Sequence, residues 1–418
     1  MFMKLDEIFE SGLWLWIAFL IFTSCGKSEV PSPDGGRKPL PLPKAERTVL
    51  AYVVGDNGQG ELSSLLMNNV LDMQQGMTGV DTDRFRLVVY SEMASDFPHL
   101  IYMRREKDGT VVMDTVVTYP ERNPLEKGVM KDVFASVMEN FPADEYGLAF
   151  LSHSTSWLPA RNDANGPMRS LGMYRLTEMN VTDFKEAIAE SFEKPLKFVL
   201  FDSCLMFSVE VAYELKEVVD FLVGSPLEIP GPGAPYKVVV PAFFAETDPA
   251  IEVGRQYFEV YRESYEKPSD GWYDGVAIGV ADCRKLSELA ARTRQVLGAF
   301  SENCGVDRRL TLRYDYSSSE ANRDFEDLMA LVTGGRESDE YLHWKESFDA
   351  AIPFWRFTPT VYSAVLYWED WSGRVDMTGA DGLSCYIPFG EAHSVANRFM
   401  RSLRWYGDAE WRYLDVIR

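Results

Sequence analysis

The chain has 418 residues, of which 46% are hydrophobic, and its formal net charge is −22 at pH 7. A chain of this length and composition can fill a sizeable core and exceeds a typical single domain, which predicts one large α/β unit with a second lobe. The negative charge excludes a nucleic-acid partner, whose phosphates would be repelled. It suits either a well-solvated surface or the attraction of basic substrates.

The N-terminal residues have the composition of a targeting segment and a tether. Residues 13–22 are an unbroken apolar run, too short to span a bilayer but long enough for a signal-peptide core. Cys25 follows the small residue Ser24, which resembles a bacterial lipoprotein cleavage site. We therefore expect residues 1–25 to be a signal peptide, Cys25 to carry lipid, and the protein to be anchored in a bacterial envelope. An apolar N-terminus with an incidental cysteine is the alternative.

Strands and helices are predicted to alternate after a Pro- and Gly-rich tether over residues 26–47. Asp108-Gly109 predicts a hairpin turn, and Thr182 is a plausible helix cap. The alternation predicts a largely parallel sheet covered by helices on both faces, in a catalytic domain over residues 48–280. Residues 281–418 are expected to form an α+β lobe packed on it, with hairpins over residues 360–388. Outside the two strands discussed next, the predicted strands are Thr48–Val54, Arg86–Tyr90, Tyr102–Arg105, Val111–Val117, Phe221–Gly224 and Val276–Val280, and the helices Leu62–Met73, Lys127–Asn140, Val181–Phe192, Ser208–Val218 and Lys285–Phe300.

Two further apolar strands end in the residues that a cysteine hydrolase needs. The run that begins at Gly147 leads into His153, and the run that begins at Lys197 leads into Cys204. If these strands are parallel neighbours, both side chains leave the sheet at the edge where open α/β sheets place their active sites. A nearby imidazole stabilises a thiolate and can later protonate a leaving amine. The alternative is a buried structural cysteine and an unrelated histidine.

Five segments in the same order resemble the clostripain family of cysteine peptidases, which is grouped with caspases and gingipains. The resemblance covers most of the chain and implies a caspase-like α/β fold and an endopeptidase that cleaves after Arg or Lys. It implies Cys204 as the nucleophile and His153 as the general acid and base. One departure is that Ser154, Thr155 and Ser156 follow His153, where the family usually carries glycine. The five segments are Thr48–Asn57, Phe141–Tyr146 with the strand after it, Phe201–Leu215, Ile229–Tyr236 and Gly382–Pro388.

The remaining site residues follow from this resemblance. The backbone amides of Ser154 and Cys204 would form the oxyanion hole. A basic P1 side chain needs a carboxylate as its partner. Asp202 is the first candidate and Glu228 is the second, although Glu228 could equally be a solvated charge on a loop. Family members are often activated by a cut between the His and Cys strands. The three basic residues of that connection are candidate cleavage sites: Arg161, Arg169, which we favour because Ser170 follows it, and Arg175.

No cofactor or metal is expected from the sequence. The four histidines form no His-Glu-x-x-His motif, and residues 55–60 lack the pattern of a phosphate-binding loop. A calcium requirement cannot be read from the residues. Two other functions stay open: a catalytically degenerate surface lipoprotein that binds peptide or glycan, suggested by the serines after His153, and a cysteine amidase acting on small molecules.

Overall fold

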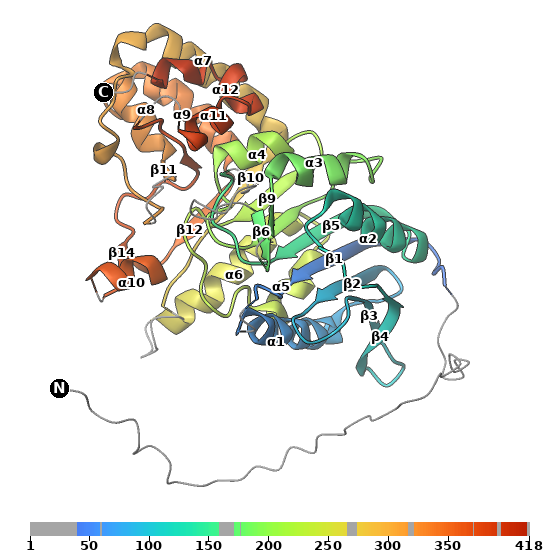
Figure 1. Ribbon diagram of the computed structural model, residues 1–418. Helices are drawn as coiled ribbons and strands as arrows, with labels where there is room; N and C mark the ends of the chain where they lie inside the picture. The colour runs from blue at the N-terminus through green and yellow to red at the C-terminus, as the bar shows by residue number, and fades with distance from the viewer. Residues whose placement is uncertain are drawn as a thin grey trace, which may run out of the picture. The chain divides into compact units, whose positions relative to one another are not determined.

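The computed structural model describes residues 40–58, 61–158, 171–175, 177–265, 274–316, 322–370, 372–390 and 394–415. Leu40–Arg418 form one compact unit. Its centre is a nine-stranded sheet (Figure 1) with the order β12-β10-β9-β8-β5-β1-β2-β3-β4. Along that order the strands are Phe354–Phe357, Ala277–Asp282, Phe221–Gly224, Val199–Asp202, Ala143–Leu151, Ala45–Val54, Phe85–Glu92, His99–Arg105 and Val111–Thr118.

The five central strands, β9, β8, β5, β1 and β2, run parallel to their neighbours. Antiparallel strands border them on both sides, including the predicted β3–β4 hairpin. The strands are apolar on both faces: Tyr52 of β1 packs in one core and Val53 in the other, as the alternation of a β-strand requires. The predicted largely parallel α/β sheet is confirmed.

Helices cover both faces of this sheet (Figure 1). One face packs against α2, α3 and α4, and the other against α1, α5 and α6. Where the sequence predicted Thr182 as a cap, α3 instead begins at Val181 after Asn180, so Thr182 lies inside the helix. The bounds are Glu61–Gly76 for α1, Lys127–Asn140 for α2, Val181–Ala189 for α3, Val209–Leu215 for α4, Tyr236–Phe243 for α5 and Pro249–Tyr265 for α6.

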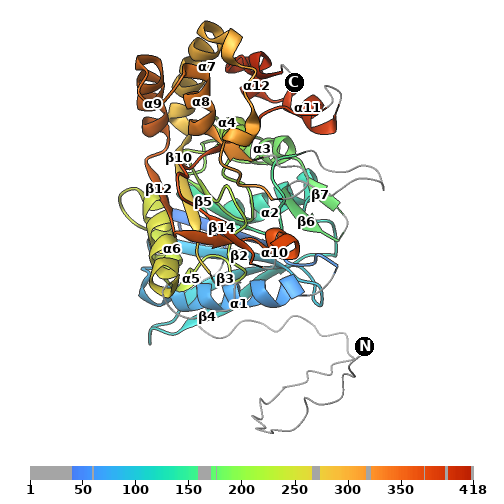
Figure 2. The same cartoon turned by 90° about the vertical axis from the view of Figure 1, so that its left-hand side faces the viewer.

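The C-terminal helices other than α10 gather at one end of the sheet (Figure 2), where α7, α8 and α9 share a core with α4. Strand β12 lies beyond the domain boundary predicted at residue 280, yet it forms an edge of the main sheet. The helices are α7 (Leu286–Ala299), α8 (Phe325–Thr333), α9 (Asp339–Ala351), α10 (Ala364–Asp370), α11 (Val395–Met400) and α12 (Arg404–Asp408), and the short strand pairs are β6 (Leu171–Tyr174) with β7 (Thr177–Met179), β11 (Arg323–Asp324) with β15 (Ser384–Cys385), and β13 (Thr360–Tyr362) with β14 (Arg374–Asp376).

The prediction of hairpins over residues 360–388 was only partly right. Strands β13 and β14 pair, but the segment between them contains helix α10. Ser363 explains the helix, because its hydroxyl accepts a hydrogen bond from the Leu366 amide (3.1 Å), and serine caps compete well with extended backbone. The Glu228 carboxylate adds acceptors for the first amides of α10.

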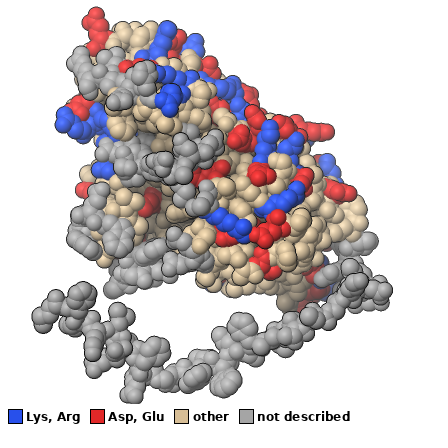
Figure 3. Space-filling model, viewed as in Figure 1, with Lys and Arg blue, Asp and Glu red and all other residues tan. Residues whose placement is uncertain are grey.

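The charged surface is mixed in sign on the face that Figure 3 shows, where acidic and basic side chains lie beside one another. Ion pairs between α2 and α3, such as Lys131–Glu190 (2.6 Å), contribute to this mixing. Within the described residues, no helix has both the length and the apolar character required to cross a bilayer.

Candidate active site

His153 and Cys204 lie just beyond the ends of neighbouring parallel strands. Strands β5 and β8 pair in parallel, with Leu151 opposite Asp202. His153 is two residues beyond Leu151, and Cys204 is two residues beyond Asp202, so both residues leave the sheet at the same level of the same edge. The His153 side chain is exposed, and Cys204 is half-buried. The fold therefore brings the two predicted catalytic residues to adjacent positions.

Both groups of this pair favour their neutral forms. Dehydration by the surrounding protein lowers the pKa of the His153 imidazole, although one side of the ring faces solvent. Burial, together with the nearby Glu228 carboxylate, raises the pKa of the Cys204 thiol to about 12, and a hydrogen bond from the Ile229 amide opposes that rise. The resting pair is then thiol and imidazole, which leaves His153 able to accept the thiol proton during attack.

The backbone beside each of these residues adopts a left-handed conformation. Leu205, directly after the cysteine, has φ 64°, and Ser156, three residues after the histidine, has φ 94°. Such angles cost roughly 1–3 kcal/mol each in a residue with a side chain and persist only where the surroundings hold them. The Leu205 amide is held by the Leu227 carbonyl at 2.8 Å. Ser154 itself is buried, and its hydroxyl donates to the Met206 sulfur at 3.1 Å.

Asp202 lies in the protein interior and does not face an open pocket. Its carboxylate accepts hydrogen bonds from the Ala234 amide (3.0 Å) and from the hydroxyls of Tyr236 (2.8 Å) and Tyr257 (3.0 Å). These donors fix the Pro-Gly loop and helices α5 and α6 against the end of β8, and a Cβ at Gly233 would come within 2.7 Å of the carboxylate. Strand β8 ends at Asp202, and the chain turns before the cysteine, so Asp202 and Cys204 are not alternate residues of one strand.

Glu228 lies beside the cysteine, on the loop after β9. It is only partly buried, and its charge adds to the rise in the pKa of the Cys204 thiol that burial mainly causes. Its own carboxylate accepts from the Ser363 hydroxyl and from the Ala364 and Val365 amides, while burial raises its pKa. The sequence analysis named Glu228 but not the contact of Ile229 with Cys204 or the hydrogen bonds of the two tyrosines to Asp202. Each of these contacts joins residues that are distant along the chain.

The candidate cleavage residues are only partly described. Arg161 and Arg169 lie outside the described residues, as does Cys25. Arg175 occupies the turn between β6 and β7, and its guanidinium pairs with Asp56 (2.8 Å) and with Glu121. The Arg175 amide also donates to the Asp56 carbonyl at 2.7 Å. Because both the backbone and the side chain are held, Arg175 is a poor cleavage site in this conformation.

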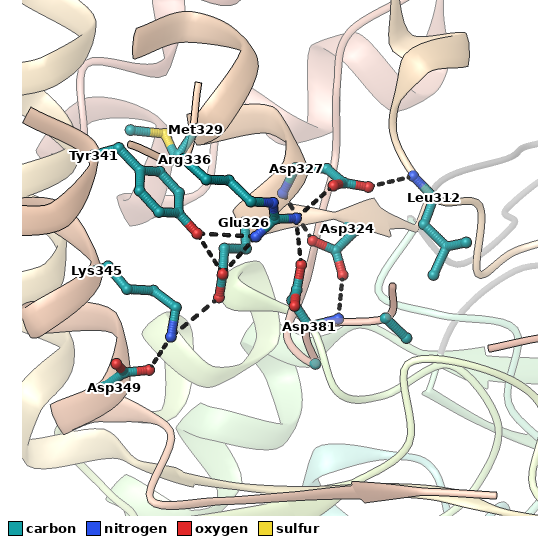
Figure 4. Close-up of polar contacts among 12 residues, drawn as sticks. Leu312, Asp324, Glu326, Asp327, Met329, Arg336, Tyr341, Lys345, Asp349 and Asp381 are labelled. Atoms are coloured by element: carbon teal, nitrogen blue, oxygen red, sulfur yellow. Dashed lines mark hydrogen bonds and ion pairs between the residues drawn. The ribbon is translucent and has the colours of Figure 1, made fainter. Parts of the chain in front are cut away.

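A second group of acidic residues lies in the C-terminal region (Figure 4). Oxygens of Asp324, Asp327 and Asp381 lie within 4.8 Å of one another, a spacing that could suit a cation. Arg336 already fills this role, because its guanidinium donates to Asp327 (2.7 Å), Asp381 (2.5 Å) and Glu326 (2.6 Å). The chain's own arginine therefore offsets part of the cluster's negative charge, through two of its three aspartates.

The parallel sheet, with a cysteine and a histidine at the ends of neighbouring strands, defines a caspase-like cysteine peptidase. Residues 51–414 match the clostripain peptidase family, and the chain belongs to that family. The protein is therefore a clostripain-family cysteine peptidase. No curated protein sequence matches it.

Solved structures of the same family resemble this fold over nearly their whole length. A secreted C11 cysteine protease from Bacteroides thetaiotaomicron, solved with an irreversible peptide inhibitor, is 36% identical with a TM-score of 0.75, covering 88% of this chain and 99% of that one. An inactive zymogen C11 protease from Parabacteroides distasonis is 25% identical with a TM-score of 0.73, covering 88% and 99%. The predicted family and the caspase-like fold are thus confirmed.

Proposed function

We propose that the protein is an exported endopeptidase in which Cys204 is the nucleophile and His153 the general acid and base. The observation that supports the proposal is that each residue lies two positions beyond the paired residues Leu151 of β5 and Asp202 of β8. The family assignment gives the reaction class, and this register supports His153 and Cys204 as the two residues of this chain that perform it together.

The mechanism follows from the neutral resting pair. His153 accepts the thiol proton as the Cys204 sulfur attacks the scissile carbonyl, and the amides of Ser154 and Cys204 stabilise the oxyanion. The imidazolium then protonates the leaving amine, and the carbonyl carbon remains attached to sulfur as a thioester. His153 then takes a proton from water as the water attacks the thioester; the C–S bond breaks, the peptide leaves as a carboxylic acid, and the imidazolium returns its proton to the Cys204 sulfur.

Single alanine substitutions test these roles. Cys204→Ala and His153→Ala should each lower kcat/KM for a peptide substrate roughly 10³-fold or more, because the pair acts as a unit. Cys304→Ala is the matched control, since Cys304 is buried in the C-terminal region and its loss should leave the rate unchanged. A Cys204→Ala protein that cleaves at the wild-type rate would exclude this mechanism.

We propose Glu228 as the carboxylate that selects a basic P1 side chain. Asp202 keeps its oxygens occupied by the Ala234 amide and two tyrosine hydroxyls, and it is only 3% exposed. Glu228 also accepts from neutral donors, but it is more exposed than Asp202 and its charge reaches the Cys204 thiol. A substrate cation at this position would gain a charged partner that a neutral side chain could not supply.

Self-cleavage in the connection between β5 and β8 is proposed at Arg161 or Arg169. The sequence around these two residues is rich in Asn, Asp, Gly and Pro, and exposed polar segments are where proteolysis concentrates. Purified wild-type protein should split into two fragments that stay associated, whereas Cys204→Ala should remain intact. Arg169→Gln and Arg161→Gln, each analysed by mass spectrometry, identify the bond. Equal fragmentation of wild-type and Cys204→Ala protein would point to a contaminating protease.

Membrane tethering through Cys25 is proposed from the sequence of the N-terminus, and the B. thetaiotaomicron relative is a secreted protease. Wild-type protein expressed in a bacterial host should incorporate a labelled fatty acid and sediment with membranes. Cys25→Ser should do neither. Equal labelling of both proteins would reject the anchor.

A further inference from the structure

Asn322 is a fully buried side chain that joins the loops of the candidate active site. It has no exposed surface, and it comes from the C-terminal region rather than from the strands that carry His153 and Cys204. Its Oδ1 atom accepts a hydrogen bond from the Ser156 hydroxyl at 3.0 Å. Its Nδ2 group donates to the carbonyls of Leu205 and Pro226, both at 3.2 Å.

These partners belong to three different loops. Ser156 follows His153, Leu205 follows Cys204, and Pro226 belongs to the loop after β9 that carries Glu228 and Ile229. Two of the partners, Ser156 and Leu205, are the residues with left-handed backbone angles. One amide therefore holds the two strained turns that orient the histidine and the cysteine.

Asn322 is itself anchored independently of those loops. The backbone carbonyl of Asn322 accepts hydrogen bonds from the backbone amides of Tyr314 (3.0 Å) and Asp315 (3.3 Å). The next residue begins β11, which pairs with β15, and Asp324 then caps helix α8. The position of the Asn322 side-chain amide is thus set by the C-terminal region, and the loops that carry His153 and Cys204 are hydrogen-bonded to it.

We infer that Asn322 is a positioning residue that sets the geometry between His153 and Cys204 through Ser156 and the Leu205 carbonyl. The inference rests on the proposed roles of that pair. Asn322 need not touch substrate, so its removal should slow the chemical step rather than weaken binding. A displacement of about 1 Å between reacting groups can lower a rate 10²-fold.

The test compares two buried asparagines in the full chain. Asn322→Ala should lower kcat for an arginine peptide about 10- to 100-fold with KM changed less than threefold, and slow the alkylation of Cys204 by iodoacetamide. Asn397→Ala is the control, because Asn397 is similarly buried, accepts from the Tyr386 hydroxyl (2.7 Å) and donates to the Phe389 carbonyl (3.1 Å). It should lower the melting temperature to a similar degree and leave kcat unchanged.

Ser156→Ala provides a milder variant in case Asn322→Ala does not fold. It removes one oxygen and should lower kcat by at least fivefold. The double variant should lose less than the product of the two single losses, because both changes break the same hydrogen bond. Wild-type kcat in Ser156→Ala, or equal kcat losses in Asn322→Ala and Asn397→Ala, would overturn the inference. An active Cys204→Ala protein would instead reject the proposed nucleophile.

Discussion

The acidic cluster around Arg336 and the active-site region around Cys204 both bury carboxylates, but they balance the charge differently. In the cluster, Arg336 and Lys345 supply cations to Glu326, and Arg336 also pairs with Asp327 and Asp381. Near Cys204, the described partners of Asp202 and Glu228 are neutral amides and hydroxyls.

The difference separates a structural site from a candidate binding site. A carboxylate that already has an arginine partner gains little from a second cation, whereas one held by neutral donors retains its full attraction for a charged ligand. By this criterion the cluster is structural, whereas Asp202 and Glu228 both have neutral donors; the greater exposure of Glu228 is the reason that we propose it for a basic substrate. The following variants test whether the two regions differ in this way.

The largest expected effect is the loss of basic selectivity in Glu228→Gln. We expect the ratio of kcat/KM for arginine over leucine at P1 to fall about 10- to 100-fold, which corresponds to one charge-assisted hydrogen bond. Paired fluorogenic peptides that differ only at P1 measure the ratio. Glu217→Gln, which changes an exposed surface carboxylate, is the control and should leave it unaltered. An unchanged ratio in Glu228→Gln would remove this residue from the P1 site.

Asp202→Asn should lower stability more than selectivity. The amide keeps the shape of the carboxylate but weakens the hydrogen bonds from Tyr236 and Tyr257, so we expect a loss of about 1–3 kcal/mol in the free energy of unfolding. Urea denaturation gives the free energy, and the same P1 peptides give the selectivity. If Asp202→Asn lowered kcat/KM for the arginine peptide but not for the leucine peptide, with the free energy of unfolding unaltered, Asp202 would be the specificity residue.

Arg336→Met should lower the free energy of unfolding by about 1–2 kcal/mol. The expected loss is below that of a fully buried ion pair because the Arg336 side chain is 40% exposed. Peptide cleavage should stay within twofold of the wild type. Arg309→Met is the control, since Arg309 pairs with Asp307 at the surface and is 83% exposed, and it should have almost no effect. A large loss of activity in Arg336→Met would mean that the cluster serves the active site.

The last expected effect is a decline in stability from about pH 5 to pH 7. Burial raises the pKa of Glu210 and of Asp324 to about 7, above the value near 4 that each carboxyl has when unfolded. The folded state therefore binds more protons across this window, and stability falls as pH rises through it, by up to ~1.4 kcal/mol per pH unit for each group. Glu210→Gln should flatten the pH profile of the melting temperature. A profile that rises over this window would contradict the assignment.

The sequence by itself determined the family, the alternation of strands and helices, and the two residues at the candidate catalytic site. Apolar runs such as those before His153 and Cys204 are local signals, because a strand buried on both faces must be apolar throughout. Helix α2 also matched its predicted span, since its buried residues recur at helical spacing. The helix between β13 and β14 was missed although its cap, Ser363, lies next to it in the sequence; only the further acceptors supplied by Glu228 come from far away along the chain.

Only the tertiary structure decided what each polar group does. The sequence ranked Asp202 before Glu228 as the candidate P1 carboxylate; in the structure Tyr236 and Tyr257 enclose the first, and the charge of the second reaches the thiol. Asn322 carried no signal at all in the sequence, because its partners belong to loops that are more than 90 residues away along the chain. Hydrophobic periodicity is a property of neighbouring residues and can be recognised in the sequence. The hydrogen-bond partners of a buried polar group come from segments that are distant along the chain, and these segments are in contact only in the folded protein.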